Sequence, residues 1–382
     1  MNSVELLKAL VAFDTTSRES NLQLIEFVRD YLEGFDVPCA LIYNDERSKA
    51  NLFATIGPVD QPGIVLSGHT DVVPVDGQPW TLPPFELTER DGKVFGRGTA
   101  DMKGYIACVL ALVPALVQAS LRLPVHIALS YDEEVGCLGV RSLLEVLQQR
   151  PIKPLLCIIG EPTELKPVLG HKGKLAMRCD VHGHPCHSAY APLGVNAIEY
   201  AAELIAELGR LGQQLKAPEH HDARFDPPYS TVQTGVISGG KALNIVPADC
   251  RFDFEIRALP SQDPGLVAQA LKAYAEREVL PRMRAISAQS EIRFSELSAY
   301  PGLVTDAQSQ AAELIAAFCG STDFATVAFG TEGGLFDAAG IPTVVCGPGS
   351  MDQGHKPDEF VSLDQLKACD EMLQRVLTFI SD

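Results

Sequence analysis

The stretch Gly63-Ile64-Val65-Leu66-Ser67-Gly68-His69-Thr70-Asp71 is a short apolar run that ends in two side chains able to serve a metal site. Three similar runs follow along the chain, at residues 125–129, 155–159 and 343–346, and the segments between them have helical character. Each run is too short for a typical helix, which indicates a buried strand. Short buried strands that alternate with helices predict an α/β fold with a mostly parallel, doubly wound sheet.

Metal-capable side chains follow each of these predicted strands. In strand order they are His69 and Asp71, then Glu133 and Glu134, then Glu161, and finally His355. Open α/β sheets bind ligands beyond the carboxyl ends of their strands. We therefore expect these side chains to meet at one edge of the sheet, as the ligands and the base of a two-metal hydrolytic site.

A further carboxylate, Asp101, lies in Gly96-Arg97-Gly98-Thr99-Ala100-Asp101-Met102-Lys103-Gly104, directly before a predicted core helix that includes residues 106–117. An aspartate at this place is commonly a helix N-cap. The alternative is a carboxylate that bridges two cations. The glycines on both sides favour the second interpretation, because they allow a close backbone approach that a cap does not require.

The spacing of the acidic and imidazole groups suggests how they divide the work. In an extended segment His69 and Asp71 point to the same side, so Asp71 can hold the ring nitrogen that does not bind metal. Taken alone, this spacing is more often structural. Glu133 and Glu134 are adjacent acids, which repel each other unless positive charge is near. One of them can bind metal while the other takes a proton from water.

Between residues 175 and 297 the pattern changes. Strands are expected at residues 174–181, 231–237, 251–257 and 291–297, and helices at residues 196–211 and 266–279. This β-α-β-β-α-β order predicts a ferredoxin-like α+β unit inserted into the larger domain. The expected boundaries are 1–174 and 298–382 for the two parts of the catalytic, metal-binding domain and 175–297 for the insertion, with hinges at residues 171–173 and 299–302.

Composition excludes several classes of protein. The 382 residues carry 49 acidic and 31 basic side chains, a formal charge of -18, which argues against nucleic-acid binding. The longest apolar stretch, residues 106–117, contains Pro114 and is too short to span a bilayer. The 10 cysteines form no C-x-x-C pair and no basic-then-apolar leader opens the chain. We expect a soluble, cytoplasmic protein with reduced thiols.

Five motifs together resemble one enzyme family over essentially the full chain. They are Gly68-His69-Thr70-Asp71-Val72-Val73-Pro74, the segment around Asp101, Asp132-Glu133-Glu134-Val135-Gly136, Gly160-Glu161-Pro162-Thr163 and Gly354-His355-Lys356-Pro357. The chain resembles the dinuclear-zinc amidohydrolase family that includes acetylornithine deacetylase, succinyl-diaminopimelate desuccinylase, aminoacylase and carboxypeptidase G. The resemblance implies two divalent ions, zinc or cobalt. It assigns His69 and Glu161 to one ion, Glu134 and His355 to the other, Asp101 to both, Glu133 as general base and Asp71 as the support of His69.

The resemblance also implies that the inserted unit is a lid that forms a homodimer. In Gly183-His184-Pro185-Cys186-His187-Ser188-Ala189, His187 would polarise the scissile carbonyl, from the same chain or across the dimer. Asn244 and Arg257 would bind a substrate carboxylate. The alternative for Arg257 is an ion pair with Asp253 or Glu255.

The substrate is expected to be a small N-acyl amino acid. In Gly330-Thr331-Glu332-Gly333-Gly334 the residues Glu332, Gly333 and Gly334 would contact it, and a glutamate suits a cationic side chain such as that of ornithine. The expected reaction is hydrolysis of N2-acetyl-L-ornithine to ornithine and acetate, in arginine biosynthesis, by attack of a metal-activated water with Glu133 as base. The alternatives are a related desuccinylase, aminoacylase or dipeptidase, and a non-catalytic metal or amino-acid binder. The presence of Glu133 argues against the binder, which needs no base.

Overall fold

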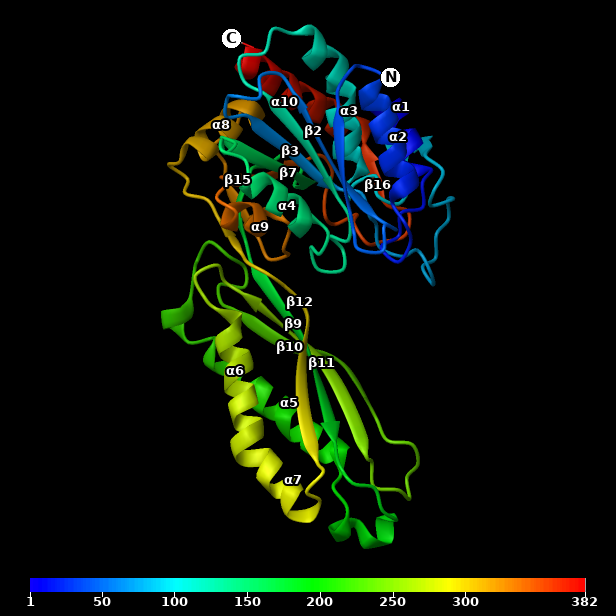
Figure 1. Ribbon diagram of the computed structural model, residues 1–382, viewed down its shortest axis with the longest axis vertical. Coiled ribbons are helices and arrows are strands. Elements are labelled where there is room, and N and C mark those ends of the chain that lie inside the picture. Colours follow the sequence, from blue (N-terminus) through cyan, green and yellow to red (C-terminus); the bar gives the residue numbers. More distant parts are fainter. Residues whose placement is uncertain (382) are drawn as a thin grey trace. The chain divides into compact units, whose positions relative to one another are not determined.

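The computed structural model describes residues 1–381, which divide into two compact units (Figure 1). Unit 1 comprises Met1–Gly170, Leu303–Thr326 and the chain from Thr331 onward. Unit 2 comprises His171–Gly302 together with Val327–Gly330.

Unit 1 is built on a nine-stranded sheet in the order β1-β2-β6-β3-β7-β15-β8-β13, with β14 beside β8. The strands are β1 Cys39–Tyr43, β2 Ala50–Ile56, β3 Ile64–His69, β6 Val125–Ser130, β7 Leu156–Pro162, β8 Val168–His171, β13 Leu303–Val304, β14 Ala325–Val327 and β15 Thr343–Gly347. The four central strands β6, β3, β7 and β15 are parallel neighbours, whereas β1, β2 and β8 pair antiparallel. The four strands predicted from apolar runs are therefore the parallel core, and the predicted α/β class is confirmed.

Helices cover both faces of this sheet. They are α1 Ser3–Val11, α2 Leu22–Glu33, α3 Lys103–Gln118, α4 Val140–Gln148, α8 Gln310–Cys319, α9 Gly333–Ala338 and α10 Leu363–Ser381. Alternate strand residues such as Leu66, Ile127 and Ile158 share one core with α1, α2, α3, α8 and α10. The helices α4 and α9 contact β6 and β15 but contribute nothing to that core, so they cover the opposite face. Because both faces are covered, the central strands are mostly apolar, which explains why their runs were visible in the sequence.

A small three-stranded sheet, β16-β5-β4, was not predicted. Its strands are β4 Thr88–Arg90, β5 Lys93–Phe95 and β16 Phe360–Ser362, each only three residues long. Phe95 pairs with Phe360, so the glycine-rich segment that follows β5 lies beside the residues that precede β16.

Unit 2 is a four-stranded antiparallel sheet in the order β10-β11-β9-β12. Its elements are β9 Gly173–His182, α5 Ala197–Gln214, β10 Thr231–Gly239, β11 Asp249–Ala258, α6 Pro264–Tyr274, α7 Leu280–Ile286 and β12 Glu291–Tyr300, with short helical turns at Ser188–Leu193, Pro218–His220 and Ala275–Val279. Alternate residues of β9, from Leu175 to Val181, pack with α5 and α6 in a second core. The β-α-β-β-α-β order and this strand arrangement confirm the predicted ferredoxin-like unit. The helix expected at residues 266–279 continues through a turn to Ile286.

Two further observations concern the chain as a whole. In residues 1–381, no helix is both long enough and apolar enough to cross a membrane. All ten cysteines are free thiols, and most of them are buried.

A buried histidine in β6 makes the stability of unit 1 sensitive to acid. His126 is 5% exposed, shares a 2.9 Å hydrogen bond with Thr55 and stacks on Phe53. Burial lowers the pKa of His126 to about 4. The folded state therefore binds fewer protons than the unfolded state between pH 4 and 6.5, so stability falls as the pH falls through that range. The loss should reach about 2–3 kcal/mol near pH 4.

We expect His126→Asn to remove this loss, because asparagine keeps a polar partner for Thr55 and does not titrate. Denaturant unfolding followed by the fluorescence of Trp80, the only tryptophan, measures the effect between pH 7 and 4.5. His220→Asn, at an exposed position, is the control. If the free energy of unfolding fell equally with pH in wild type and in His126→Asn, His126 would not be the source of the acid sensitivity.

Candidate metal centre

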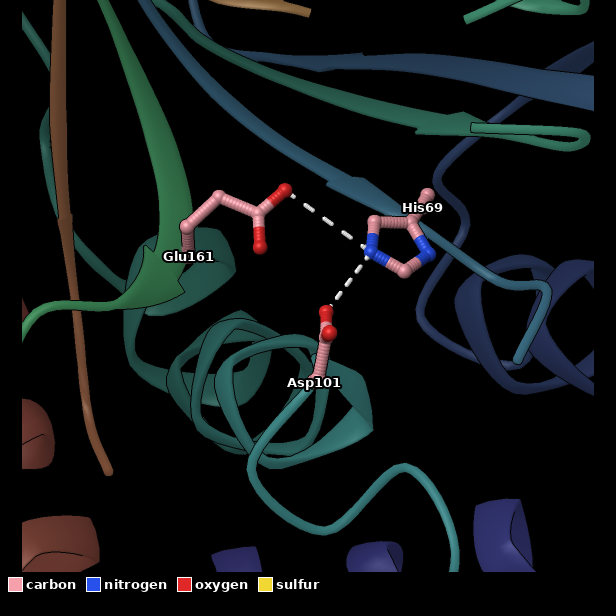
Figure 2. A group of neighbouring side chains, drawn as sticks. All are labelled: His69, Asp101 and Glu161. Atoms are coloured by element: carbon pink, nitrogen blue, oxygen red, sulfur yellow. Dashed lines mark hydrogen bonds and ion pairs between the residues drawn. The ribbon is translucent and has the colours of Figure 1, made fainter. Parts of the chain in front are cut away.

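Three side chains form a buried group at the carboxyl edge of the sheet in unit 1. His69 is the last residue of β3, Glu161 lies near the end of β7, and Asp101 precedes α3. Nε2 of His69 is 3.0 Å from Oδ1 of Asp101 and 3.7 Å from Oε1 of Glu161, and Figure 2 shows the ring facing both carboxylates. None of these side chains is more than 5% exposed. This group can hold one ion.

A second group shares Asp101 with the first. Nε2 of His355 is 3.2 Å from Oδ2 of Asp101 and 3.0 Å from Oε2 of Glu134. His355 lies in the loop after β15, where its φ of 62° is in the left-handed region, and its side chain is 52% exposed. This group can hold a second ion.

The two oxygens of Asp101 therefore face two different imidazole rings. The common alternative role, a helix N-cap, is absent here because the cap of α3 is Met102 and no side chain caps that helix. Asp101 thus belongs to both groups, and its role as a bridge between two cations stays a prediction.

Asp71 supports His69 in a more distributed way than its spacing suggested. Nδ1 of His69 is 2.9 Å from the main-chain oxygen of Asp71 and 3.6 Å from its carboxylate Oδ1. The carboxylate also accepts hydrogen bonds from Ser17 Oγ and from the main-chain N–H groups of Glu133 and Glu134. Asp71 therefore ties the end of β3 to the turn that carries both glutamates.

The site carries more negative charge than its imidazoles can balance. Burial raises the pKa of Glu134 to about 7 and raises the pKa of Glu161. Burial opposes a charge on Asp101, but the hydrogen bonds from His355 and His69 lower the pKa of Asp101 below its usual range. Hydrogen bonds to Asp101 and Glu134 raise the pKa of His355 to about 11. Such a cluster attracts cations, and its ligands must give up their protons when a metal ion binds.

The residues fit a pair of divalent ions. Each group offers one imidazole and two carboxylates, a ligand set that suits Zn²⁺ and that Co²⁺ also accepts. Among residues 1–381, Oε1 of Glu134 has no hydrogen-bond partner although it is buried. A buried carboxylate oxygen without a donor is costly unless a cation satisfies it.

Glu133 stands beside both groups without belonging to either. Its Oε1 is 3.5 Å from the thiol of Cys137. Burial raises the pKa of Glu133 well above its usual value, and the neighbouring charges of Glu134 and Glu332 add to the effect while His69 opposes it. A raised pKa makes this carboxylate a better proton acceptor, as a general base requires.

Glu332 lies directly before α9 and is only 1% exposed. Burial raises the pKa of Glu332 to about 7, while Ser130 and the charge of His69 oppose that rise. Within the described chain its Oε1 has no hydrogen-bond partner. The carboxyl of Glu332 is therefore buried and near enough to His69 to interact with its charge. Gly333 and Gly334, at the start of α9, are also buried.

The remaining predicted residues belong to unit 2. His187 is exposed, and its neighbour Ser188 donates a hydrogen bond to the main-chain oxygen of Asn244. His187 and Asn244 thus lie on adjacent loops. Arg257 is half-buried and forms an ion pair with Glu255 at 3.3 Å and a hydrogen bond with Tyr300.

Arg257 lies at the other end of its strand from these loops. The partner that Arg257 takes is Glu255, because Asp253 is paired with Arg178. On β11, Arg257 is opposite Lys174, whereas Asp249 is opposite His182. Eight residues of strand, roughly 26 Å, separate these ends. Within unit 2 the chain therefore brings His187 close to Asn244 but not to Arg257.

Several residues around the site were not singled out from the sequence. Ser17 binds Asp71, and the fully buried Lys103 donates a 2.8 Å hydrogen bond to the main-chain oxygen of Phe13. Glu359 accepts hydrogen bonds from the segment that carries Asp101. Lys103 and Glu359 lie in or beside the sequence motifs around Asp101 and His355, but residue type alone does not reveal which groups they contact.

Known proteins similar to this chain were found at the level of family, sequence and fold. The model of peptidase family M20/M25/M40 matches residues 65–378. Acetylornithine deacetylase of Pasteurella multocida (strain Pm70) is 35% identical over 98% of this chain and 97% of its own length. Acetylornithine deacetylase of Myxococcus xanthus is 36% identical over 97% and 95%.

Solved structures share the fold at lower identity. An M20-family metallo-carboxypeptidase from Sulfolobus solfataricus is 19% identical with a TM-score of 0.78, covering 100% of this chain and 99% of its own. A dinuclear metal-binding peptidase of the M20 family from Bacillus subtilis is 15% identical with a TM-score of 0.61, covering 99% and 97%. These two similarities concern the fold.

The shared position of Asp101 predicts a specific pattern of metal loss. We expect Asp101→Ala to weaken the binding of both metal ions, because each group then keeps only two ligands. We expect Glu133→Gln to retain both ions while turnover falls by about 10²–10⁴-fold, as for a lost general base. Metal analysis after dialysis, with turnover measured in parallel, tests this. Two retained ions in Asp101→Ala, or two lost ions in Glu133→Gln, would contradict the division of roles.

Proposed function

Because the chain belongs to peptidase family M20/M25/M40 and is a hydrolase, we propose that it removes the acetyl group of N2-acetyl-L-ornithine, giving L-ornithine and acetate. The observation that carries the proposal is the 35% identity to an acetylornithine deacetylase over 98% of this chain. The reaction is a step of arginine biosynthesis in the cytoplasm. The ten free thiols support a reducing compartment.

The chain supplies the ligands of two divalent ions, Zn²⁺ or Co²⁺. The assignment is His69 and Glu161 to the first, Glu134 and His355 to the second, and Asp101 to both. Bound ions of this kind polarise an amide carbonyl and lower the pKa of water. This assignment of ligands is supported by the distances of 3.0–3.7 Å between the imidazole nitrogens and the carboxylate oxygens.

The other catalytic roles fall to residues that bind no metal. Glu133 accepts a proton from the attacking water and returns it to the leaving amine, and its raised pKa supports this role. Asp71 keeps the His69 ring in place. His187 stabilises the negative charge that develops on the carbonyl oxygen. Asn244 and Arg257 bind the substrate carboxylate, for which a guanidinium is a matched partner. Because Asn244 lies beyond the Asp249 end of β11 and Arg257 lies at the other end, they reach one substrate from different chains of a dimer.

We infer a homodimer in which unit 2 of one chain completes the site of its partner. The proposed domains are 1–174 with 298–382 for catalysis and 175–297 for the lid and the dimer interface. Support comes from unit 2 itself: His187 and Asn244 lie near the His182 end of β9, whereas the other end of β9, Gly173, lies next to the start of unit 2 at His171. A ten-residue strand, roughly 30 Å long, lies between these ends.

The preference for a cationic side chain rests on Glu332, with Gly333 and Gly334 lining the same stretch. A carboxyl that is buried without a full set of partners gains most from an ammonium group. The alternative substrates are those of related enzymes: N-succinyl-diaminopimelate, other N-acyl amino acids and dipeptides.

The substrate assignment is tested with metal-depleted protein that is resupplied with zinc or cobalt. N-acetylornithine should release its amine faster than N-acetylmethionine, N-succinyl-diaminopimelate or a dipeptide. Glu332→Gln should lower kcat/KM for N-acetylornithine relative to N-acetylmethionine by about 10-fold or more, the effect of one lost charge contact. An unchanged ratio would show that Glu332 does not select the substrate. No amine from any substrate would favour a non-catalytic binder.

The dimer assignment is tested by mixing two inactive variants, His187→Ala and Glu133→Gln. If His187 acts across the dimer, each mixed dimer has one site with both changes and one with neither. Random exchange should then restore up to about a quarter of wild-type sites. If His187 acts within its own chain, every site keeps one defect and no activity returns. Mixing Glu133→Gln with Glu133→Ala is the control that should stay inactive in either case.

A further inference from the structure

The loop that carries His355 is held through its main chain by two side chains outside the ligand set. Nε2 of Gln78 donates a 3.0 Å hydrogen bond to the main-chain oxygen of His355. Nη1 of Arg97 is 3.3 Å from the main-chain oxygen of the next residue, Lys356. Both bonds fix the backbone at the point from which the imidazole ring projects.

The orientation of the Gln78 amide is forced by its neighbours. Its Oε1 accepts hydrogen bonds from Nη2 of Arg97 and from Nε1 of Trp80. Guanidinium and indole N–H groups can only donate, so the amide oxygen must face them. The NH₂ group of Gln78 is therefore directed to the oxygen of His355, and Arg97 lies 5.0 Å from the Trp80 ring centroid in a cation–π contact.

The same arginine is anchored to the segment that carries the bridging carboxylate. Arg97 and Glu359 are both 1% exposed and form an ion pair at 2.7 Å. Glu359 also accepts hydrogen bonds from the main-chain N–H groups of Gly98, Ala100 and Asp101. All four donors reach one carboxylate, because the pairing of Phe95 with Phe360 places the two segments side by side.

These contacts form a continuous path from Asp101 through Glu359, Arg97 and Gln78 to His355. The path matters most at its last member. His69 and Glu161 are fixed by buried strands, but the ring of His355 is half exposed and stands on a loop. Packing alone therefore does not hold His355 within reach of Asp101 and Glu134.

We propose that Gln78 is a positioning residue for the second metal ion, acting through the main chain of His355, with Arg97 and Glu359 as its anchor to Asp101. The inference rests on the proposed function, since it requires a bound metal. It concerns the ion of Asp101, Glu134 and His355, and leaves the ion of His69 and Glu161 unaffected.

Calorimetric titration of metal-free, full-length protein with Zn²⁺ alone tests the proposal. In Gln78→Ala the second ion should bind about 10–100-fold more weakly, as for other outer-shell partners of ligands, and the first ion should be unchanged. Gln78→Glu should weaken it similarly, because it keeps an acceptor for Arg97 and Trp80 but loses the donor to His355. Gln78 is partly exposed, so both variants should fold. Gln118→Ala, at an exposed position on α3, is the matched control.

The same titration in a His355→Ala variant identifies which of the two ions binds more weakly. In His355→Ala only the first ion binds well, so adding Gln78→Ala there should change nothing further. Wild-type affinity for both ions in Gln78→Ala, equal weakening of both ions, or a wild-type response in Gln78→Glu would each overturn the proposal. Wild-type protein that binds no zinc would refute the metal centre itself, a failure recognised before any variant is compared.

Discussion

Asp101 places its two carboxylate oxygens against two imidazole rings, 3.0 Å from Nε2 of His69 and 3.2 Å from Nε2 of His355. A buried carboxylate of this kind needs positive charge on both sides, because its neighbours Glu134 and Glu161 are also acids. The main-chain N–H of Asp101 donates a hydrogen bond to Glu359. The arrangement of side chains at this edge of the sheet follows from the Asp101 carboxylate. Each of the other candidate ligands lies where it can share a cation with Asp101.

The fold meets this requirement through the ends of its central strands. The strands β3, β6, β7 and β15 are parallel neighbours, so their carboxyl ends lie at one edge of the sheet. Their interiors are mostly apolar because helices cover both faces, and an apolar run that stops at His69 or Glu161 is visible in the sequence. That is why the sheet could be predicted, and why the side chains that gather at its edge could be singled out: burial on two faces leaves a simple pattern, and a strand end is a single place in the chain.

Other parts of the site depend on contacts that leave no local pattern. Arg97 and Glu359 are 262 positions apart and meet only because strands of three residues pair, which is too short for any periodicity to show. The alternation along β11 predicts that Arg257 lies on the polar face, but not that Glu255 rather than Asp253 becomes its partner. The burial of Glu332 likewise follows from where α9 begins against the sheet, which the surrounding glycines do not specify.

The two ligand groups are built in different ways, and the difference suits hydrolysis. The first is closed: its side chains are at most 5% exposed and two of the three stand on strands, which favours firm retention of an ion. The second is open, because His355 is 52% exposed and stands on a loop. A catalytic centre needs an accessible position for water and substrate, and a fully buried ligand shell would exclude both. An exposed ligand is, however, also a mobile one unless its backbone is fixed. The hydrogen bonds from Gln78 and Arg97 to the main chain at His355 and Lys356 resolve that conflict, since they order the loop without covering the ring.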